Sequence, residues 1–371
     1  MEPLTLAIGR ASRRQFCLTA AMSPLAFLAG SQLARADGAA RAKSLIVLWL
    51  DGGPSQLETF DPHPGTEIGG PTGAIETAAT GVRLSANLPL LAREMKSVTL
   101  VRSLMSKEGD HERGRYNLKT GYRLNPSVVH PALGAICSAE LPAGDTQLPR
   151  YVQILGRDPQ SKGGYLGEAH DPFHIDDPAD PVPDLRAPVE DDRLKRRIAN
   201  LEVIEGALAG RNRKLETRTE HLGQVRRALR VMQSSQLKAF KVDEEPAAVR
   251  ERYGNTPFGR GCLAARRLVE AGVPCIEVQL GGWDSHARNF EVHKNLCATL
   301  DPAFAALVAD LRDRGMLDST LVLCMGEFGR TPQINGVGGR DHWPTGFAAA
   351  IAGGGVQGGR AIGVTDPAGK P

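Results

Sequence analysis

The chain has 371 residues, of which 41% are hydrophobic and 23% are charged, a composition typical of a globular protein rather than a disordered one. Lys and Arg together number 45 against 42 Asp and Glu, so the formal net charge is only +3. Such a balance produces no strong positive field, and we therefore expect no nucleic-acid partner.

The first 36 residues have the three parts of an export signal. Residues 13–16 (RRQF) are basic, an apolar stretch runs over 18–33, and residues 34–36 (ARA) have the small-residue pattern of a cleavage site. The paired arginines resemble a twin-arginine signal, so we expect a periplasmic or secreted protein that has no membrane contact once the signal is removed. A short membrane anchor is the alternative, although Ser23, Pro24 and Gly30 interrupt the apolar stretch.

Five cysteines remain beyond this segment, and they are widely scattered: Cys137, Cys262, Cys275, Cys297 and Cys324. They show neither the paired spacing of a zinc site nor the density of a disulfide scaffold. An oxidising compartment would allow one or two disulfides, whose pairing the sequence does not specify.

Three apolar segments predict buried parallel strands, and each is followed by an acidic residue. They are residues 43–50 before Asp51, residues 275–280 before Asp284, and residues 320–325 before Glu327. Residues 260–271 and 303–314 have helical spacing and end before glycines. This alternation predicts an α/β fold, a mostly parallel sheet flanked by helices, in which ligands bind at the carboxyl ends of the strands.

Residues 191–240 predict a helical insertion, entered through a loop at 171–192 that is rich in Pro and Asp. Leucines recur there at intervals of seven, namely Leu194, Leu201, Leu208, Leu215, Leu222 and Leu229. We favour a hairpin within the chain over a dimerising coiled coil, because Gly206, Gly210 and Gly223 interrupt the pattern.

The chain ends soon after its last predicted strand, which covers residues 347–354. No closing helix or strand is predicted before Pro371. We therefore expect either a truncated domain of residues 37–371 or a loose tail.

Six side chains form a candidate site for a divalent metal ion. Carboxylates suit Mg²⁺, Ca²⁺ and Mn²⁺, while imidazole also suits Zn²⁺, so acidic residues and histidines gathered at strand ends favour metal binding. The proposed ligands are Asp51, Asp284, His286, Glu327, Asp341 and His342. Taken singly, each has a simpler explanation as a helix cap or a surface residue.

Four motifs carry a resemblance to a known family: LDGGPSQ at 50–56, GWDSH at 282–286, GEFGRTP at 326–332 and GRDHWP at 339–344. From about Ser44 to the C-terminus the chain closely resembles the DUF1501 family, which belongs with the alkaline phosphatases and sulfatases. The resemblance implies an alkaline-phosphatase-like fold, with Asp51 as the metal aspartate of the first strand. The motif at Glu327 has Phe328 in place of a histidine, so a second metal lacks one ligand unless Asp341 replaces it.

Residues 111–121 resemble the sulfatase signature, with His111 at the position of the modified nucleophile. The resemblance leaves three roles open for His111: metal ligand, covalent acceptor or general base. Ser55, Ser103 and Ser106 are other candidate hydroxyls. Arg115 and Arg330 are candidates to hold an anionic group, and the alternative for both is a salt bridge to the carboxylates of the site.

The leading interpretation is an exported metal-dependent hydrolase of phosphate or sulfate esters, acting on a small anionic ester or a sulfated or phosphorylated glycan. The alternatives are a non-catalytic metal- or glycan-binding protein of the same fold, and an isomerase or phosphomutase. Trp283 and Trp343 flank the proposed ligands and either stack on a sugar or pack beneath the site. The sequence indicates neither the oligomeric state nor the substrate.

Overall fold

The computed structural model describes residues 42–142, 144–182, 189–211 and 221–370, so the predicted export signal lies outside the described residues. The strands are β1 (Ser44–Leu50), β2 (Ala74–Glu76), β3 (Arg83–Ser85), β4 (Val98–Leu104), β5 (Tyr151–Ile154), β6 (Phe173–Ile175), β7 (Cys275–Leu280), β8 (Thr320–Met325), β9 (Gly329–Arg330), β10 (His342–Trp343), β11 (Phe347–Gly353) and β12 (Arg360–Ile362). The α-helices are α3 (Pro89–Glu94), α4 (His111–Thr120), α5 (Leu133–Glu140), α6 (Asp191–Arg211), α7 (His221–Met232), α8 (Ala247–Tyr253), α9 (Pro257–Glu270) and α10 (Asn289–Asp313).

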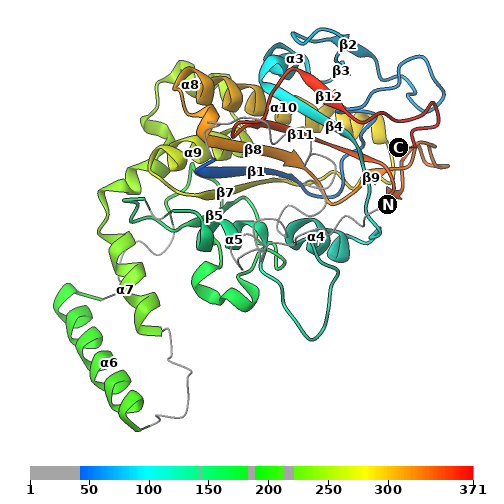
Figure 1. The fold of residues 1–371 in the computed structure, drawn as a ribbon. Coiled ribbons are helices and arrows are strands. Elements are labelled where there is room, and N and C mark those ends of the chain that lie inside the picture. Colours follow the sequence, from blue (N-terminus) through cyan, green and yellow to red (C-terminus); the bar gives the residue numbers. More distant parts are fainter. Residues whose placement is uncertain (1–41, 143, 183–188, 212–220, 371) are drawn as a thin grey trace, which may run out of the picture.

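Eight of these strands form one sheet in the order β12-β4-β11-β8-β1-β7-β5-β6. Within it β11 alone runs antiparallel to its neighbours, and all the other pairs are parallel. Helices cover both faces of the sheet (Figure 1). The predicted fold class, a mostly parallel sheet flanked by helices with a helical insertion, is confirmed.

Strand β1 lies at the centre of the sheet and is buried along its whole length. Its side chains alternate between the two faces, as the pleat of a strand requires. Ile46, Leu48 and Leu50 join the larger core with α9 and α10, whereas Val47 and Trp49 join a smaller core against α4 and α5. This two-sided burial explains why the sequence of β1 is a continuous apolar run.

Of the two helices predicted on the larger core, α9 has the expected capping residues, whereas α10 differs from its predicted limits. Helix α9 begins after Thr256, whose side chain accepts a hydrogen bond from the backbone N–H of Gly259 at 3.0 Å, and it ends just before Gly272, whose φ is +84°. Helix α10 is longer than predicted: it begins at Asn289 and passes through Pro302 without stopping. Burial of its apolar face in the larger core outweighs the local cost of the proline.

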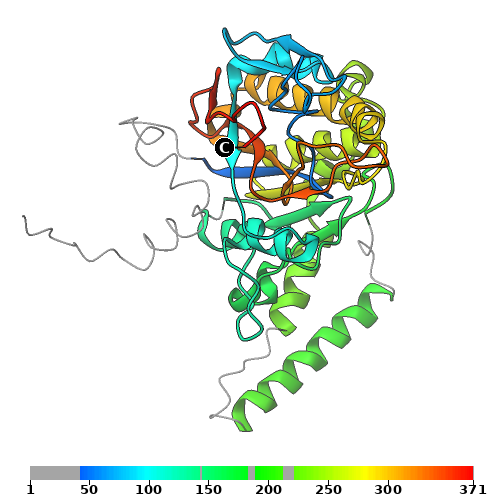
Figure 2. The same cartoon turned by 90° about the vertical axis from the view of Figure 1, so that its right-hand side faces the viewer.

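The region predicted as an insertion contains α6 and α7, which project from the body of the molecule in both views (Figures 1 and 2). Glu202 of α6 and Arg226 of α7 form an ion pair at 2.6 Å, a contact that a hairpin within the chain requires. The limits of this insertion, 191–240, stay a prediction. Among the described residues, no helix combines the length and apolarity needed to cross a membrane.

The end of the chain differs from the expectation. Residues Arg360–Ile362 form β12, which pairs in parallel with β4 at the edge of the sheet. The expectation of no closing strand was therefore wrong, because a three-residue edge strand is too short to leave a periodic pattern in the sequence.

A buried lysine fixes α4 to the sheet. Lys119, in the last turn of α4, lies 2.7 Å from Glu277 of β7 and 2.6 Å from Asp158. Its ammonium group also sits over the ring of Trp49 at 4.5 Å from the centroid. Removal of Lys119 would leave the carboxylates of Glu277 and Asp158 buried beside each other without their cation, so this contact favours docking of α4 at this place.

A fully buried histidine makes the stability of the fold depend on pH. His293 of α10 accepts a hydrogen bond from the backbone N–H of Ser55 at its Nε2 (2.8 Å), and its Nδ1 donates to the carbonyl of Asn289 (3.0 Å). Both ring nitrogens are thus used by the neutral form. Burial lowers the pKa of His293 from 6.5 to about 4, so the unfolded chain takes up a proton more readily than the folded one.

We therefore expect the contribution of neutral His293 to the free energy of unfolding to be fully present above pH 6.5. This contribution should be lost as the pH falls toward 4, by about 1.4 kcal/mol per pH unit. Substitution His293→Gln removes the titration while keeping a donor and an acceptor. The difference in the free energy of unfolding between pH 7 and pH 5, measured by urea denaturation, should shrink by about 2 kcal/mol. His174→Gln, at a half-buried site, is the control. An unchanged pH dependence in His293→Gln would contradict this account.

Candidate metal centre

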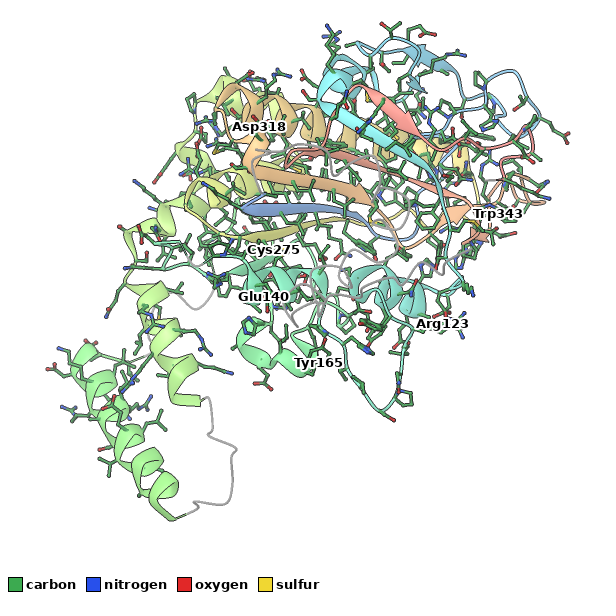
Figure 3. All side chains as sticks on the ribbon, viewed as in Figure 1. Arg123, Glu140, Tyr165, Cys275, Asp318 and Trp343 are labelled. Carbon is green, nitrogen blue, oxygen red and sulfur yellow. The ribbon has the colours of Figure 1, made fainter. Side chains whose placement is uncertain are left out.

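The candidate residues meet at the carboxyl ends of β1, β7 and β8, which are neighbours in the sheet. Asp51 follows β1 directly, and Asp284 and Glu327 follow β7 and β8 after short turns. His111 is the first residue of α4, and His342 belongs to β10. Figure 3 shows Trp343, beside His342, at the right edge of the body, and Asp318, which precedes β8, at its upper left.

Gly52 allows these strand ends to approach one another. Its φ is +113°, and a Cβ at this position would lie only 2.5 Å from the backbone nitrogen of Asp284. The N–H of Gly52 donates to Oε1 of Glu327 at 3.0 Å. A residue without a side chain is therefore required where the ends of β1, β7 and β8 meet.

Three histidines direct the same ring nitrogen toward one carboxylate. The Nε2 atoms of His286 and His342 lie 3.1 and 3.2 Å from Oδ1 of Asp284, and the Nε2 atom of His111 lies 3.4 Å from its Oδ2. The ligand atoms of His111, Asp284 and His342 all lie within 4.8 Å of one another. His286 joins this set through its Nε2, which lies 3.1 Å from Asp284 Oδ1 and 3.0 Å from His342 Nε2. We call the side chains of His111, Asp284, His286 and His342 the four-donor group.

The opposite nitrogen, Nδ1, is held by an oxygen acceptor in each of the three rings. His111 Nδ1 lies 2.7 Å from Glu327 Oε1, and His286 Nδ1 lies 2.8 Å from Asp341 Oδ1. His342 Nδ1 donates to the carbonyl oxygen of Gly109 at 2.7 Å. In the neutral rings these acceptors favour the proton on Nδ1 and the lone pair on Nε2, which is the arrangement of metal-binding histidines.

The four-donor group fits a divalent metal ion. The Nε2 atoms of His286 and His342 face each other at 3.0 Å, although both carry lone pairs in the tautomers just described. The Nε2 atom of His111 is buried and has no hydrogen-bond partner. An ion with tetrahedral bonds of about 2.1 Å holds its ligand atoms about 3.4 Å apart, close to the separations observed.

Arg330 keeps Asp284 ionised. Burial is the largest single effect and opposes ionisation of Asp284. The hydrogen bond from Arg330 at 2.5 Å, the charge of Arg330 and the nearby His342 and His111 together overcome it and lower the pKa of Asp284 to about 2. Arg330 is fully buried, and its guanidinium also donates to the carbonyl oxygens of Gly52, Gly53 and Arg340. All three guanidinium nitrogens therefore have protein acceptors.

Asp51 and Glu327 lie beside the four-donor group rather than within it. The Nε atom of Arg115 lies 2.8 Å from Asp51 Oδ1 and 3.8 Å from Glu327 Oε1. Glu327 has no exposed surface, and its hydrogen bond raises the pKa of His111 against the opposing effect of burial. Of the six proposed ligands, Asp284, His286 and His342 thus belong to the four-donor group. Glu327 and Asp341 instead contact the Nδ1 atoms of histidines, and Asp51 pairs with Arg115.

Sequence reasoning missed a buried ion pair that supports the loop carrying Asp341 and His342. Arg340 donates to Glu58 Oε1 at 2.9 Å and to the carbonyl oxygens of Ile68 and Thr331, and neither Arg340 nor Glu58 has exposed surface. The only sequence signal was the position of Arg340 inside the GRDHWP motif. Glu58 gave none, because nothing in its local sequence indicates burial.

Breaking this pair should destabilise the protein strongly. In Glu58→Gln the charge of Arg340 is left buried without a counter-ion, and we expect a loss of about 3–5 kcal/mol in the free energy of unfolding, measured with urea. Asp176→Asn is the matched control, because the Asp176–Arg157 pair is exposed and such pairs contribute about 1 kcal/mol or less. Equal effects of the two substitutions would refute the role of burial.

These features define an α/β protein with a candidate mononuclear metal centre at the carboxyl end of its sheet. Residues 42–371 match the family described as "Protein of unknown function (DUF1501)", and the chain belongs to that family, as its four motifs predicted. No curated protein of known annotation matches the chain.

Three solved structures have distant similarity. A PsFucS1 sulfatase from Pseudoalteromonas sp. is 13% identical, with a TM-score of 0.40, over 95% of this chain and 69% of that one. The lipoteichoic acid synthase LtaP from Listeria monocytogenes is 9% identical, with a TM-score of 0.39, over 90% and 69%. The alkaline phosphatase of the Antarctic bacterium TAB5 is 13% identical, with a TM-score of 0.36, over 87% and 95%. These similarities are too low to assign a role to any residue, so the chemistry rests on the site itself.

Proposed function

We propose that the protein is a metal-dependent hydrolase of phosphate or sulfate esters. The observation that supports this best is the four-donor group, in which three Nε2 atoms converge on Asp284 while oxygen acceptors hold each Nδ1. Three imidazoles and one carboxylate favour Zn²⁺ among Zn²⁺, Ca²⁺, Mg²⁺ and Mn²⁺. Such an ion supplies Lewis acidity, which stabilises negative charge on an ester oxygen.

The proposal assigns the remaining residues according to their contacts. Glu327 and Asp341 orient His111 and His286, and Arg330 orients Asp284. Of the three roles open to His111, that of metal ligand fits best, because Glu327 holds its Nδ1 and its Nε2 faces Asp284. Arg115 is half-buried and pairs with Asp51, so it places a permanent positive charge beside the four-donor group.

The second candidate function is metal or glycan binding without catalysis, and one observation favours it. Ser55 is fully buried, and the hydroxyl of Ser106 donates to Asn117, so neither is a free and exposed nucleophile. With His111 assigned as a ligand and these two serines discounted, the hydrolase proposal uses water as the nucleophile. A protein that binds the metal and anionic esters without turnover would fit this second function.

The proposal includes export and a small anionic ester or a sulfated or phosphorylated glycan as substrate. Cleavage after residue 36 and recovery of the mature protein outside the cytoplasm are expected, with N-terminal sequencing of the recovered protein as the measurement. Replacement of both Arg13 and Arg14 by Lys should abolish export through the twin-arginine route. Unaffected export in that variant would remove this part of the proposal.

Metal content tests the centre directly. We expect one Zn²⁺ per wild-type chain after loading and dialysis, and less than about one tenth of that in Asp284→Asn and His342→Ala, because each removes a ligand atom. Elemental analysis gives the metal content, and hydrolysis of phosphate and sulfate esters of 4-nitrophenol gives the activity. The bound metal and the hydrolytic activity should be lost together in these two variants.

Matched controls lie far from the centre. Asp318→Asn changes an exposed carboxylate at the upper left of the body (Figure 3), and His174→Ala changes a histidine that contacts the carbonyl of Gly156. Both should keep the wild-type metal content. A wild-type protein that binds no metal after loading would end the hydrolase proposal, whereas bound metal without turnover of any ester would favour the binding protein.

A further inference from the structure

Beside the four-donor group lies a second cluster of charge, formed by Asp51, Glu327 and Arg115. The guanidinium of Arg115 contacts Asp51 through Nε at 2.8 Å and through Nη2 at 3.5 Å. The same Nε atom lies 3.8 Å from Glu327 Oε1. Arg115 is therefore the cation between two carboxylates that come from the ends of β1 and β8.

Glu327 requires a cation in this position. It has no exposed surface, and its Oε2 atom is buried without a hydrogen-bond partner. Its Oε1 atom interacts with the N–H of Gly52 and with His111 Nδ1, which are hydrogen-bond donors without a fixed charge. A buried carboxylate that lacks a counter-ion is strongly destabilising, and Arg115 is the nearest permanent positive charge.

The position of Arg115 is fixed by the helix that carries it. His111 and Arg115 are separated by four residues on α4 and therefore lie on the same face of the helix. The first supplies a nitrogen to the four-donor group, and the second supplies a positive charge next to it. A guanidinium stays protonated at any physiological pH, so this charge does not depend on metal supply.

We propose that Arg115 occupies the position in which Asp51 and Glu327 would otherwise hold a second divalent cation, and that the centre consequently selects ester anions of a single negative charge. This inference rests on the proposed function. It excludes a two-metal centre and identifies the substrate class as a sulfate monoester or a phosphate diester, which share the chemistry of a singly charged ester.

The net charge of the site supports the proposed preference for singly charged esters. Asp51, Asp284, Glu327 and Asp341 are four carboxylates, and Arg115 and Arg330 are the two guanidinium groups that contact them. A single divalent ion makes this set neutral. A singly charged ester then adds one negative charge to the centre. The dianion of a phosphate monoester adds two negative charges, and the centre has no second metal ion to offset the additional one.

Metal stoichiometry tests the position of Arg115 without any assay of activity. Zinc-loaded and dialysed wild-type protein should contain one Zn²⁺ per chain by elemental analysis. Arg115→Ala frees Asp51 and Glu327 and should raise the value to two, whereas Arg115→Lys keeps a cation and should leave it at one. Circular dichroism and thermal unfolding show whether each variant is folded.

The outcomes separate this inference from the proposed function. No bound zinc in the wild type overturns the metal centre as a whole. Two zinc ions in the wild type overturn only the assignment of Arg115. A folded Arg115→Ala variant that still binds one ion also overturns that assignment, and if this variant does not fold, the wild-type stoichiometry decides alone.

Ester charge is tested with three probes on the zinc-loaded wild type at pH 8: 4-nitrophenyl sulfate, bis(4-nitrophenyl) phosphate and 4-nitrophenyl phosphate. We expect kcat/KM for one of the first two to exceed that for the third by at least about tenfold, and the better of the two distinguishes sulfate from diester. Calorimetric binding of the same probes shows the preference if turnover is absent. Preference for the phosphate monoester overturns the assignment of substrate class.

Discussion

The structure depends on one buried negative charge, the carboxylate of Glu327, at the end of β8. A carboxylate with no exposed surface must be neutralised and hydrogen-bonded within the protein. Its neighbours meet this requirement from three directions: the N–H of Gly52 at the end of β1, His111 at the start of α4, and the guanidinium of Arg115. The charge thus fixes two strand ends and a helix relative to one another, and the orientation of His111 follows from it.

Beside this charge, the residues of the metal centre form two shells with different chemistry. The inner shell consists of the four-donor group, that is, the Asp284 carboxylate and the three Nε2 atoms. The outer shell consists of Glu327, Asp341 and the carbonyl of Gly109, which hold the rings, together with Arg330, which holds Asp284. Arg340 and Glu58 support the outer shell from the core. Because the inner atoms are held by neighbours that are themselves buried or hydrogen-bonded, little rearrangement is needed to bind an ion.

Much of the sheet was predictable because parallel strands buried on both faces have continuous apolar sequences. The predicted limits of residues 275–280 and 320–325 coincide with β7 and β8, and the strand before Asp51 was misplaced by one residue. Strand β5 was not predicted, because it has only four residues and its Gln153 points into a polar network with Glu277. Tertiary hydrogen bonds of this kind leave no periodic signal in the sequence.

The composition of the site was predictable, but its internal arrangement was not. An aspartate or glutamate near a metal has the same local sequence whether it is a ligand or the hydrogen-bond partner of a ligand. The difference between Asp284 and Asp341 lies in which ring nitrogen each carboxylate faces, and this follows from the path of two loops. Likewise, the sequence placed Arg115 near an anion without showing that the anions are Asp51 and Glu327.

Helix α4 links the two halves of this centre across the sheet. Asp284 and His286 come from the loop after β7, and His342 comes from β10. His111 and Arg115 come from α4, which docks through Lys119 on the smaller core. A folding intermediate in which α4 has not yet docked would retain only part of the ligand set. Ion affinity and helix docking are therefore linked equilibria, and by mass action an ion that binds the complete set holds α4 in place. A bound ion would then stabilise the docked position of α4 as well as the ligand set.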